Sequence, residues 1–180
     1  MLGEEGPLNE SMKTPEIVPR IPPELAKVID AGVRANLIVP DGVATGGSVC
    51  ALYSQHRTSL DIDFVLTNLR EQFDEVRERL LEEPGWREAR VRAPNFIAGS
   101  LDQIQIGFRQ LRRQTPIETQ EVRTAEGRLV IPTLEEMLRI KVLLASERNV
   151  TRDFFDFAEL ATLYPQEKVI SIGVTQLVCT

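Results

Sequence analysis

The chain of 180 residues has little cysteine, modest proline and glycine, and no long hydrophobic run. Its two cysteines, Cys50 and Cys179, cannot build a disulfide framework, so a reducing cytoplasm is the expected compartment. No apolar stretch approaches the roughly 20 residues that span a bilayer, and the N-terminus lacks the basic-then-apolar order of a signal peptide. With 11 glycines and 11 prolines, collagen-like and wholly disordered chains are excluded as well. We therefore expect a cytoplasmic globular protein of about one domain.

Charge is distributed unevenly along the chain. The net charge is −6, which argues against non-specific adhesion of the whole chain to nucleic acid. Residues 87–152 nevertheless contain 12 Lys and Arg against 8 Asp and Glu, a local charge of +4. Such a division suits a site that holds metal cations on one side and phosphates on the other, although ordinary solvated faces would give the same counts.

The first half of the chain alternates helical and strand patterns. Residues 1–21 show neither period and are expected to be a flexible lead-in, followed by a domain over residues 22–165. The pair Pro22-Pro23 is expected to open a helix whose apolar residues follow the 3.6-residue period. The other elements expected in this half are a strand at 43–45, a glycine turn at 46–48, a helix from 49, a strand at 60–66 and a helix at 70–83.

The second half predicts several short strands and then two helices. The strand-like runs cover residues 89–91, 103–108, 117–122 and 129–131. Thr133 and Glu136 form a capping box for a helix that reaches about Arg148, and a second helix is expected at 151–163. The apolar tail, residues 166–180, could pair at a sheet edge, form a dimer contact or be disordered. These patterns predict an α+β fold with a mixed sheet, flanking helices and a C-terminal helical pair.

Two carboxylates stand two residues apart in an otherwise apolar strand. Alternate residues of a strand share a face, so Asp61 and Asp63 should point the same way, about 6.6 Å apart along the chain. Paired carboxylates can share divalent cations. The turn Gly46-Gly47-Ser48 lies upstream, where glycines let the backbone approach a ligand and a helix start favours phosphate. Each feature alone also fits an ordinary strand or turn, but their combination indicates a phosphate and metal site.

These residues resemble the nucleotidyltransferase superfamily of the DNA polymerase beta type, whose signature is a glycine-serine turn followed by paired aspartates. The likeness is closer to the branch of AbiEii-type toxins, which shows His-Arg-x-Ser-x-Asp-Ile-Asp-Phe after the turn. Residues 56–64 here read His-Arg-Thr-Ser-Leu-Asp-Ile-Asp-Phe. The branch also shows a late lysine and a following Arg-Asp-x-x-Asp, which correspond to Lys141 and to Arg-Asp-Phe-Phe-Asp at 152–156.

The resemblance implies a nucleotidyltransferase-like fold and transfer of a nucleotide from an NTP to an acceptor hydroxyl. It implies a divalent metal, usually Mg²⁺ or else Mn²⁺, bound by Asp61 and Asp63. Lys141 would contact phosphate or neutralise its developing charge, and Asp153 would orient Lys141 or help to position the acceptor. The implied triphosphate-binding residues are Gly46, Gly47 and Ser48.

The residues themselves leave other roles open. Lys141 falls on an apolar helical stripe, where a lysine can instead extend its ammonium to water. Asp156 could pair with Arg148 or Arg152 rather than take part in chemistry, and His56 and Arg57 are expected to cap or brace the turn. Asp102, at the start of the strand at 103–108, either completes a metal-binding triad with Asp61 and Asp63 or faces the core side or lies in the turn.

The sequence leaves the acceptor and the binding partner open. A basic cluster, Arg109, Arg112 and Arg113, would grip nucleotide or nucleic-acid phosphate, or would simply be solvated. In the toxin branch the acceptor can be transfer RNA and the protein partner a cognate antitoxin, yet only 10 Phe, Trp and Tyr are available for an RNA platform. A catalytically weak protein that binds nucleotide or a protein partner, and an enzyme that modifies a small molecule, are the competing hypotheses.

Overall fold

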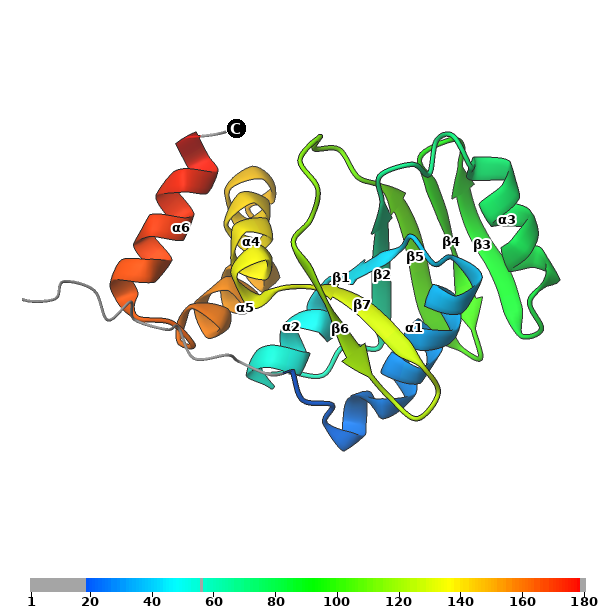
Figure 1. Cartoon of the computed structure of the whole chain (residues 1–180), viewed down its shortest axis with the longest axis horizontal. Helices are drawn as coiled ribbons and strands as arrows, with labels where there is room; N and C mark the ends of the chain where they lie inside the picture. Colours follow the sequence, from blue (N-terminus) through cyan, green and yellow to red (C-terminus); the bar gives the residue numbers. More distant parts are fainter. Residues whose placement is uncertain (1–18, 56, 179–180) are drawn as a thin grey trace, which may run out of the picture.

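The computed structural model describes residues 19–55 and 57–178, with side chains described as far as Val174 (Figure 1). The expected lead-in lies almost wholly outside these residues. The helices are a short 3₁₀ turn η1 (Pro23–Leu25), α1 (Ala26–Ile38), α2 (Gly47–Ser54), α3 (Phe73–Glu82), α4 (Leu134–Arg148), α5 (Thr151–Ala161) and α6 (Gln166–Val178). The strands are β1 (Val43–Thr45), β2 (Asp61–Leu66), β3 (Trp86–Arg92), β4 (Phe96–Leu101), β5 (Ile104–Gln110), β6 (Thr119–Arg123) and β7 (Arg128–Pro132).

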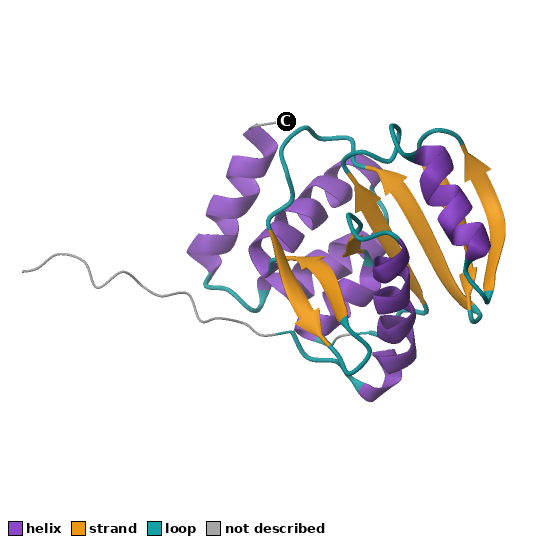
Figure 2. Ribbon diagram, turned by 45° about the vertical axis from the view of Figure 1, so that its right-hand side comes forward, coloured by secondary structure: helices purple, strands orange, loops and turns teal. Residues whose placement is uncertain are grey.

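Five strands form a mixed sheet in the order β1-β2-β5-β4-β3. Strands β2 and β5 are parallel, and the other neighbouring pairs are antiparallel. The hairpin β6–β7 is a separate two-stranded sheet that packs against β1 and α1 (Figure 2). The mixed sheet and its flanking helices confirm the α+β prediction.

One face of the five-stranded sheet is closed by α1 and α3. Phe64 of β2 and Phe108 of β5 stack there with ring centroids 5.2 Å apart, and both are fully buried. Each such side chain stabilises the fold by about 1.5–3 kcal/mol through burial. The other residues that share this buried layer are Val28, Ile29, Val33, Ile62, Leu66, Val76, Leu80, Ile97, Leu101 and Ile106. Asp61 and Asp63 alternate with this layer, so they stand on the opposite, open face.

Most predicted elements are present, with two corrections. Strand β4 was not predicted, although it is the central partner of both β3 and β5. The tail was left open between a sheet-edge strand, a dimer contact and disorder, and as far as Val178 it forms the helix α6. Its β-branched residues favour strands in isolation, but α6 packs on α4 and buries Ile172. The C-terminal part is therefore three helices rather than a pair.

Candidate functional site

The two strand carboxylates stand together at the beginning of β2. Both lie on the open face, where Asp61 is exposed and Asp63 is half-buried. Ser59 Oγ donates a hydrogen bond to Asp61 Oδ1, and Thr45 Oγ1 donates one to the carbonyl of Asp63 at 3.3 Å. These contacts hold the local backbone and orient the Asp61 carboxylate.

The glycine turn lies beside this pair, as its spacing in the sequence predicts. Gly46 has φ of 89°, a conformation that favours glycine, and α2 starts at Gly47. A Cβ on Gly46 would come 3.7 Å from Asp63 Oδ2. Ser48 is fully buried, and its hydroxyl donates to the carbonyl of Asp61 at 2.5 Å. The hydroxyl that the resemblance assigns to phosphate thus ties α2 to the carboxylate strand in this structure.

Arg57 lies directly over the turn. A Cβ on Gly47 would overlap the Arg57 guanidinium, so Arg57 can lie here because residue 47 has no side chain. Arg57 also makes two hydrogen bonds to Asp156 of α5, from Nε at 2.7 Å and from Nη2 at 3.0 Å. A nearby Asp61 carboxylate contributes to the raised pKa of Arg57, after the hydrogen bond to Asp156 as the main cause. Arg57 therefore braces the turn and places a permanent positive charge beside Asp61.

A buried ion cluster supports this arginine. Lys141 of α4 donates from Nζ to Asp153 Oδ1 at 3.1 Å and to Asp156 Oδ2 at 2.7 Å. Lys141 is 3% exposed and Asp156 is 0% exposed, so the lysine does not reach water as the apolar-stripe alternative supposed. The pairing of Asp156 with Arg148 or Arg152 was also wrong, because its carboxylate turns inward to Arg57 and Lys141. We call Arg57, Lys141, Asp153 and Asp156 the ion cluster.

Cys50 of α2 is buried next to the ion cluster. Burial raises the pKa of its thiol to about 12, and the charges of Lys141 and Arg57 lower it only in part. For Lys141, burial lowers the pKa, but the electrostatic interaction with Cys50 and the contacts with Asp156 and Asp153 outweigh burial. The net pKa of Lys141 therefore lies above the ordinary value. The lysine is therefore a permanent cation at neutral pH, and the thiol is neutral.

The second carboxylate faces a cationic neighbourhood. Arg109 of β5 lies 3.6 Å from Asp63 Oδ1, and its guanidinium sits 4.3 Å above the centre of the Phe96 ring. Burial and the charge of Asp61 raise the pKa of Asp63, while Arg109 and Arg152 act in the opposite direction. Sequence reasoning did not single out Phe96, and it considered Arg152 only in its motif and as a partner of Asp156. The proximity of these residues to Asp63 depends on the strand register and on the placement of α5.

The structure does not place Asp102 beside the two carboxylates of β2. Asp102 lies in the turn before β5, has φ of 48° and pairs with Arg34 of α1, on the side of the closed face. In the register of β2 with β5, Gln105 lies opposite Asp61 and Gly107 opposite Asp63. Among the described residues, no group of three or more His, Cys, Asp and Glu is placed to hold a metal ion. Of the three predicted carboxylates, Asp61 and Asp63 are the two that share the open face of the sheet.

The three arginines of the predicted basic cluster, Arg109, Arg112 and Arg113, have different surroundings in the structure. Arg113 is engaged by Glu136 at 2.6 Å and by the carbonyls of residues 115 and 116, so it is not free for a ligand. Of the two hydrogen bonds of the predicted capping box, one is present: the Glu136 backbone N–H donates to Thr133 Oγ1 at 3.3 Å. The Thr133 N–H donates instead to the carbonyl of Glu118. Arg112 is exposed. Of the predicted basic cluster, Arg109 is the member beside the carboxylates.

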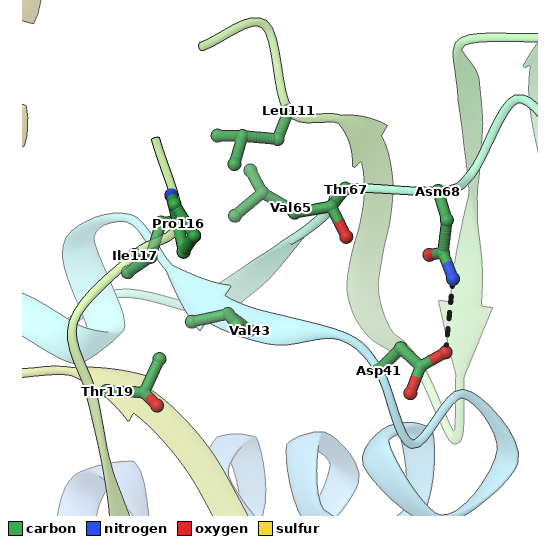
Figure 3. A pocket seen from close by; sticks show the side chains of 9 residues that line it. All are labelled: Asp41, Val43, Val65, Thr67, Asn68, Leu111, Pro116, Ile117 and Thr119. Carbon is green, nitrogen blue, oxygen red and sulfur yellow. Dashed lines mark hydrogen bonds between the residues drawn. The ribbon is translucent and has the colours of Figure 1, made fainter. Parts of the chain in front are cut away.

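A groove of about 420 Å³ continues along the acid-bearing face of β1 and β2 (Figure 3). Its floor contains Val43 and Val65, which face each other in the register of the two strands. Figure 3 shows Leu111, Pro116 and Ile117 beside these valines, and Asn68 Nδ2 donating to Asp41 Oδ2; the distance between these two atoms is 3.3 Å. Val65 is the next residue after Asp63 on the same face of β2, so the groove is adjacent to the carboxylate pair. Its volume is large enough for part of a ligand.

Sequence comparisons find similarity to curated proteins over a minor part of the chain. No family model matches it. A stretch of 57 residues is 46% identical to part of the heme uptake protein MmpL11 of Mycobacterium tuberculosis and of the probable transport protein MmpL11 of Mycobacterium bovis. The match covers 31% of this chain, and the chain spans about 6% of the length of these curated relatives. Within the described residues, no helix has the length and apolar character needed to cross a membrane.

Solved structures give a broader likeness. ANT(2'')-Ia, in complex with adenylyl-2''-tobramycin, matches with a TM-score of 0.61 and 13% identity over 85% of this chain and 97% of its own. An antigenic nucleotidyltransferase-like protein from Paracoccidioides brasiliensis matches with 0.57 and 16% over 89% and 90%. The lincosamide antibiotic adenylyltransferase LnuA matches with 0.52 and 12% over 81% and 99%. The chain therefore has the fold of nucleotidyltransferases.

Proposed function

We propose that this protein transfers a nucleotidyl group from an NTP to an acceptor hydroxyl. In the reaction a bond forms between the acceptor oxygen and the α-phosphorus, the bond from that phosphorus to the β-phosphate bridge breaks, and pyrophosphate leaves with release of the hydroxyl proton. The observation that carries the proposal is the meeting of three features on one sheet face: Asp61 and Asp63, the glycine turn that opens α2, and the Arg57 guanidinium above that turn.

The donor set fits Mg²⁺ or Mn²⁺. Mg²⁺ is usually held by one or two carboxylates together with substrate phosphates and water, so the two carboxylates of β2 satisfy its protein share. Asp61 and Asp63 would hold the ion, which when bound supplies charge neutralisation on the reacting phosphates. The carboxyl oxygens on the open face are accessible from the glycine turn, as the 3.7 Å approach of a Gly46 Cβ to Asp63 indicates.

The remaining residues act by placement and charge. Backbone N–H groups at the start of α2 and the Arg57 guanidinium would bind the triphosphate, because both present positive charge to the same space. Lys141 and Asp153 act through Asp156, whose carboxylate orients Arg57. Lys141 is therefore a positioning residue in this proposal, in contrast to the direct phosphate contact that the resemblance implies.

The acceptor in this proposal is a hydroxyl of RNA, and the biological role is that of a toxin held by a cognate antitoxin. The resemblance of residues 56–64 and 141–156 to AbiEii-type toxins supports both assignments. Two neighbours in fold are named with the small molecules adenylyl-2''-tobramycin and lincomycin, and a third is the Megavirus polyadenylate synthase. The fold thus accommodates polymeric and small acceptors.

The first test is calorimetric titration with the four NTPs, with and without Mg²⁺. We expect metal-dependent binding that Asp61→Asn/Asp63→Asn abolishes. The matched control is Asp74→Asn/Glu78→Gln, which removes the same charge from exposed positions of α3. Equal binding by the two variants would contradict the assignment of the site.

The second test separates nucleotidyl from phosphoryl transfer. The protein is incubated with transfer RNA and with an NTP labelled at either the α- or the γ-phosphate. Label from the α-phosphate should appear in the RNA, and label from the γ-phosphate should appear only in pyrophosphate. Transfer of the γ label would replace this function with a kinase activity.

A second candidate is a catalytically weak protein that binds nucleotide or a protein partner. Gly107 occupies the β5 position opposite Asp63, and the ammonium of Lys141 is enclosed by two carboxylates. Within the described part of the chain, neither a third carboxylate on β5 nor the Lys141 ammonium is therefore presented on the open face. Metal-dependent NTP binding without transfer to any acceptor would establish this candidate.

A further inference from the structure

The open sheet face carries three arginines at its far edge. Along β3, Arg87, Arg90 and Arg92 are exposed, whereas Glu88 and Val91 are half-buried toward α3 and the core. A register shift between Glu88 and Arg90 keeps all three arginines on the open side despite their uneven spacing. We call these three residues the arginine strip.

The strand register connects the arginine strip to the carboxylates. Arg90 pairs with Ala98 of β4, which pairs with Gly107 of β5, which pairs with Asp63 of β2. Three strand spacings of about 4.8 Å separate the ends of this row, about 14 Å in all. The two middle members of this row are small, and the Phe96 ring of the neighbouring row reaches to 3.6 Å from where a Gly107 Cβ would stand. The neighbouring row contains Arg92, Phe96, Arg109 and Val65.

The arginine strip is not neutralised by acidic neighbours. None of its members takes part in the ion pairs found among the described residues, and Glu88 on the same strand pairs with Arg77 behind the sheet. The chain as a whole has a net charge of −6, so the strip is a local exception. Charged side chains on an edge strand can also serve to prevent pairing with another chain, which gives a competing explanation.

Resting on the proposed function, we propose that this face binds a single-stranded nucleic acid whose terminal hydroxyl is the acceptor. The arginine strip would bind the phosphates, and the Phe96 ring with the Arg109 guanidinium upon it would offer a surface for a base. A strand held in this way extends across Ala98 and Gly107 and ends at Asp61 and Asp63. A cationic small acceptor would be repelled by the same surface.

The test measures binding of a fluorescently labelled oligouridylate by anisotropy, without NTP or metal. The strip variant, Arg87→Gln/Arg90→Gln/Arg92→Gln, is compared with a control variant that removes equal charge from exposed sites elsewhere, Arg20→Gln/Arg123→Gln/Arg148→Gln. We expect the strip variant to bind about tenfold more weakly or worse, and its slope of log K against log salt to decrease by about 2, since each single-strand phosphate contact contributes about 0.7. The control should change neither quantity comparably.

A second variant, Phe96→Leu, keeps an apolar side chain and removes the ring. It should weaken binding without changing the salt slope, because stacking releases no counterions. Equal oligouridylate binding by the strip and control variants would overturn the proposal. If the strip variant self-associates in gel filtration with unchanged binding, the arginines protect the edge; if polyglutamate competes as well as oligouridylate, the partner is an acidic protein.

These outcomes are independent of the proposed function. NTP binding is titrated in the same proteins, and the strip variant should retain it because β3 lies three strands from β2. If the wild type does not bind NTP, the proposed transfer reaction is wrong, and the oligouridylate result is unaffected. If the wild type binds NTP and the strip variant binds oligouridylate as the control variant does, only the proposed nucleic-acid surface is wrong.

Discussion

Removing the charge of Lys141 tests whether the ion cluster is structural. Lys141→Met keeps the aliphatic stem but leaves Asp153 without its cation and Asp156 with Arg57 as its remaining cationic partner among those described here. Breaking a buried ion pair on one side costs about 3–5 kcal/mol, because the other charge stays uncompensated. For a domain of this size that loss corresponds to a decrease of about 6–20 °C in Tm.

Urea unfolding followed by circular dichroism provides the assay. Lys168→Met serves as the control, since Lys168 pairs with Glu135 at the surface and such pairs contribute about 0–1 kcal/mol. Lys141→Met/Asp153→Asn should lose less stability than Lys141→Met alone, because the uncompensated carboxylate is gone. A loss of under about 1 kcal/mol in Lys141→Met, together with abolished transfer, would refute this reasoning and return Lys141 to direct phosphate contact.

The pH dependence of this contribution follows from the raised pKa of Lys141. A lysine whose pKa is higher in the folded than in the unfolded state contributes fully below the unfolded value, about 10.4, and loses that contribution as pH rises through the folded value. The stability difference between the wild type and Lys141→Met should therefore be constant near neutral pH and decrease only in strong alkali.

Two further predictions concern groups near the site. Gly107→Ala should weaken metal-dependent NTP binding, measured by calorimetry, because its Cβ would lie 2.6 Å from Asp63 Oδ1 and displace that carboxylate; unchanged affinity would contradict the observed register. In a Cys179→Ser background, Cys50 should resist thiol-reactive dye until the protein unfolds, since the thiol is buried with a pKa of about 12; rapid labelling of folded protein would show that α2 opens.

Local patterns predicted the elements whose signals lie within one segment. Strand β2, the turn at Gly46 and the capped start of α4 follow from alternation, glycine and Thr133. Strand β4 was missed because its residues 98–100 are small and weakly strand-forming, so the strand depends on its neighbours β3 and β5 for pairing. Helix α6 was missed for the related reason that its packing on α4 outweighs β-branched composition.

The site was predictable only in its local parts. The carboxylate pair and the turn lie within 18 residues of each other, and their spacing indicated both. The contact between Arg57 and Asp156 joins residues 99 apart, and no periodicity in either segment specifies it. The sequence predicted Lys141 as a functional lysine, but whether its ammonium faces a ligand or a carboxylate depends on where α5 packs.

The register of β2 with β5 also limits where a third carboxylate can stand. At position 107 even a Cβ would contact Asp63 Oδ1 at 2.6 Å, so a longer acidic side chain is excluded while Asp63 keeps its place. Gln105 is exposed on the same face, directly opposite Asp61, and its side chain is an uncharged isostere of glutamate. A third metal carboxylate can therefore be supplied on β5 at position 105.

Gln105→Glu should consequently strengthen Mn²⁺ binding, followed by calorimetry or by the electron paramagnetic resonance of free Mn²⁺. Gln103→Glu is the matched control, because it adds the same charge in the exposed turn before β5, away from Asp61 in the strand register. An additional carboxylate ligand increases both the charge and the number of oxygen donors, so tighter binding by Gln105→Glu alone is expected. Equal affinities for the two variants would show that Asp61 and Asp63 do not present a metal to this face of the sheet.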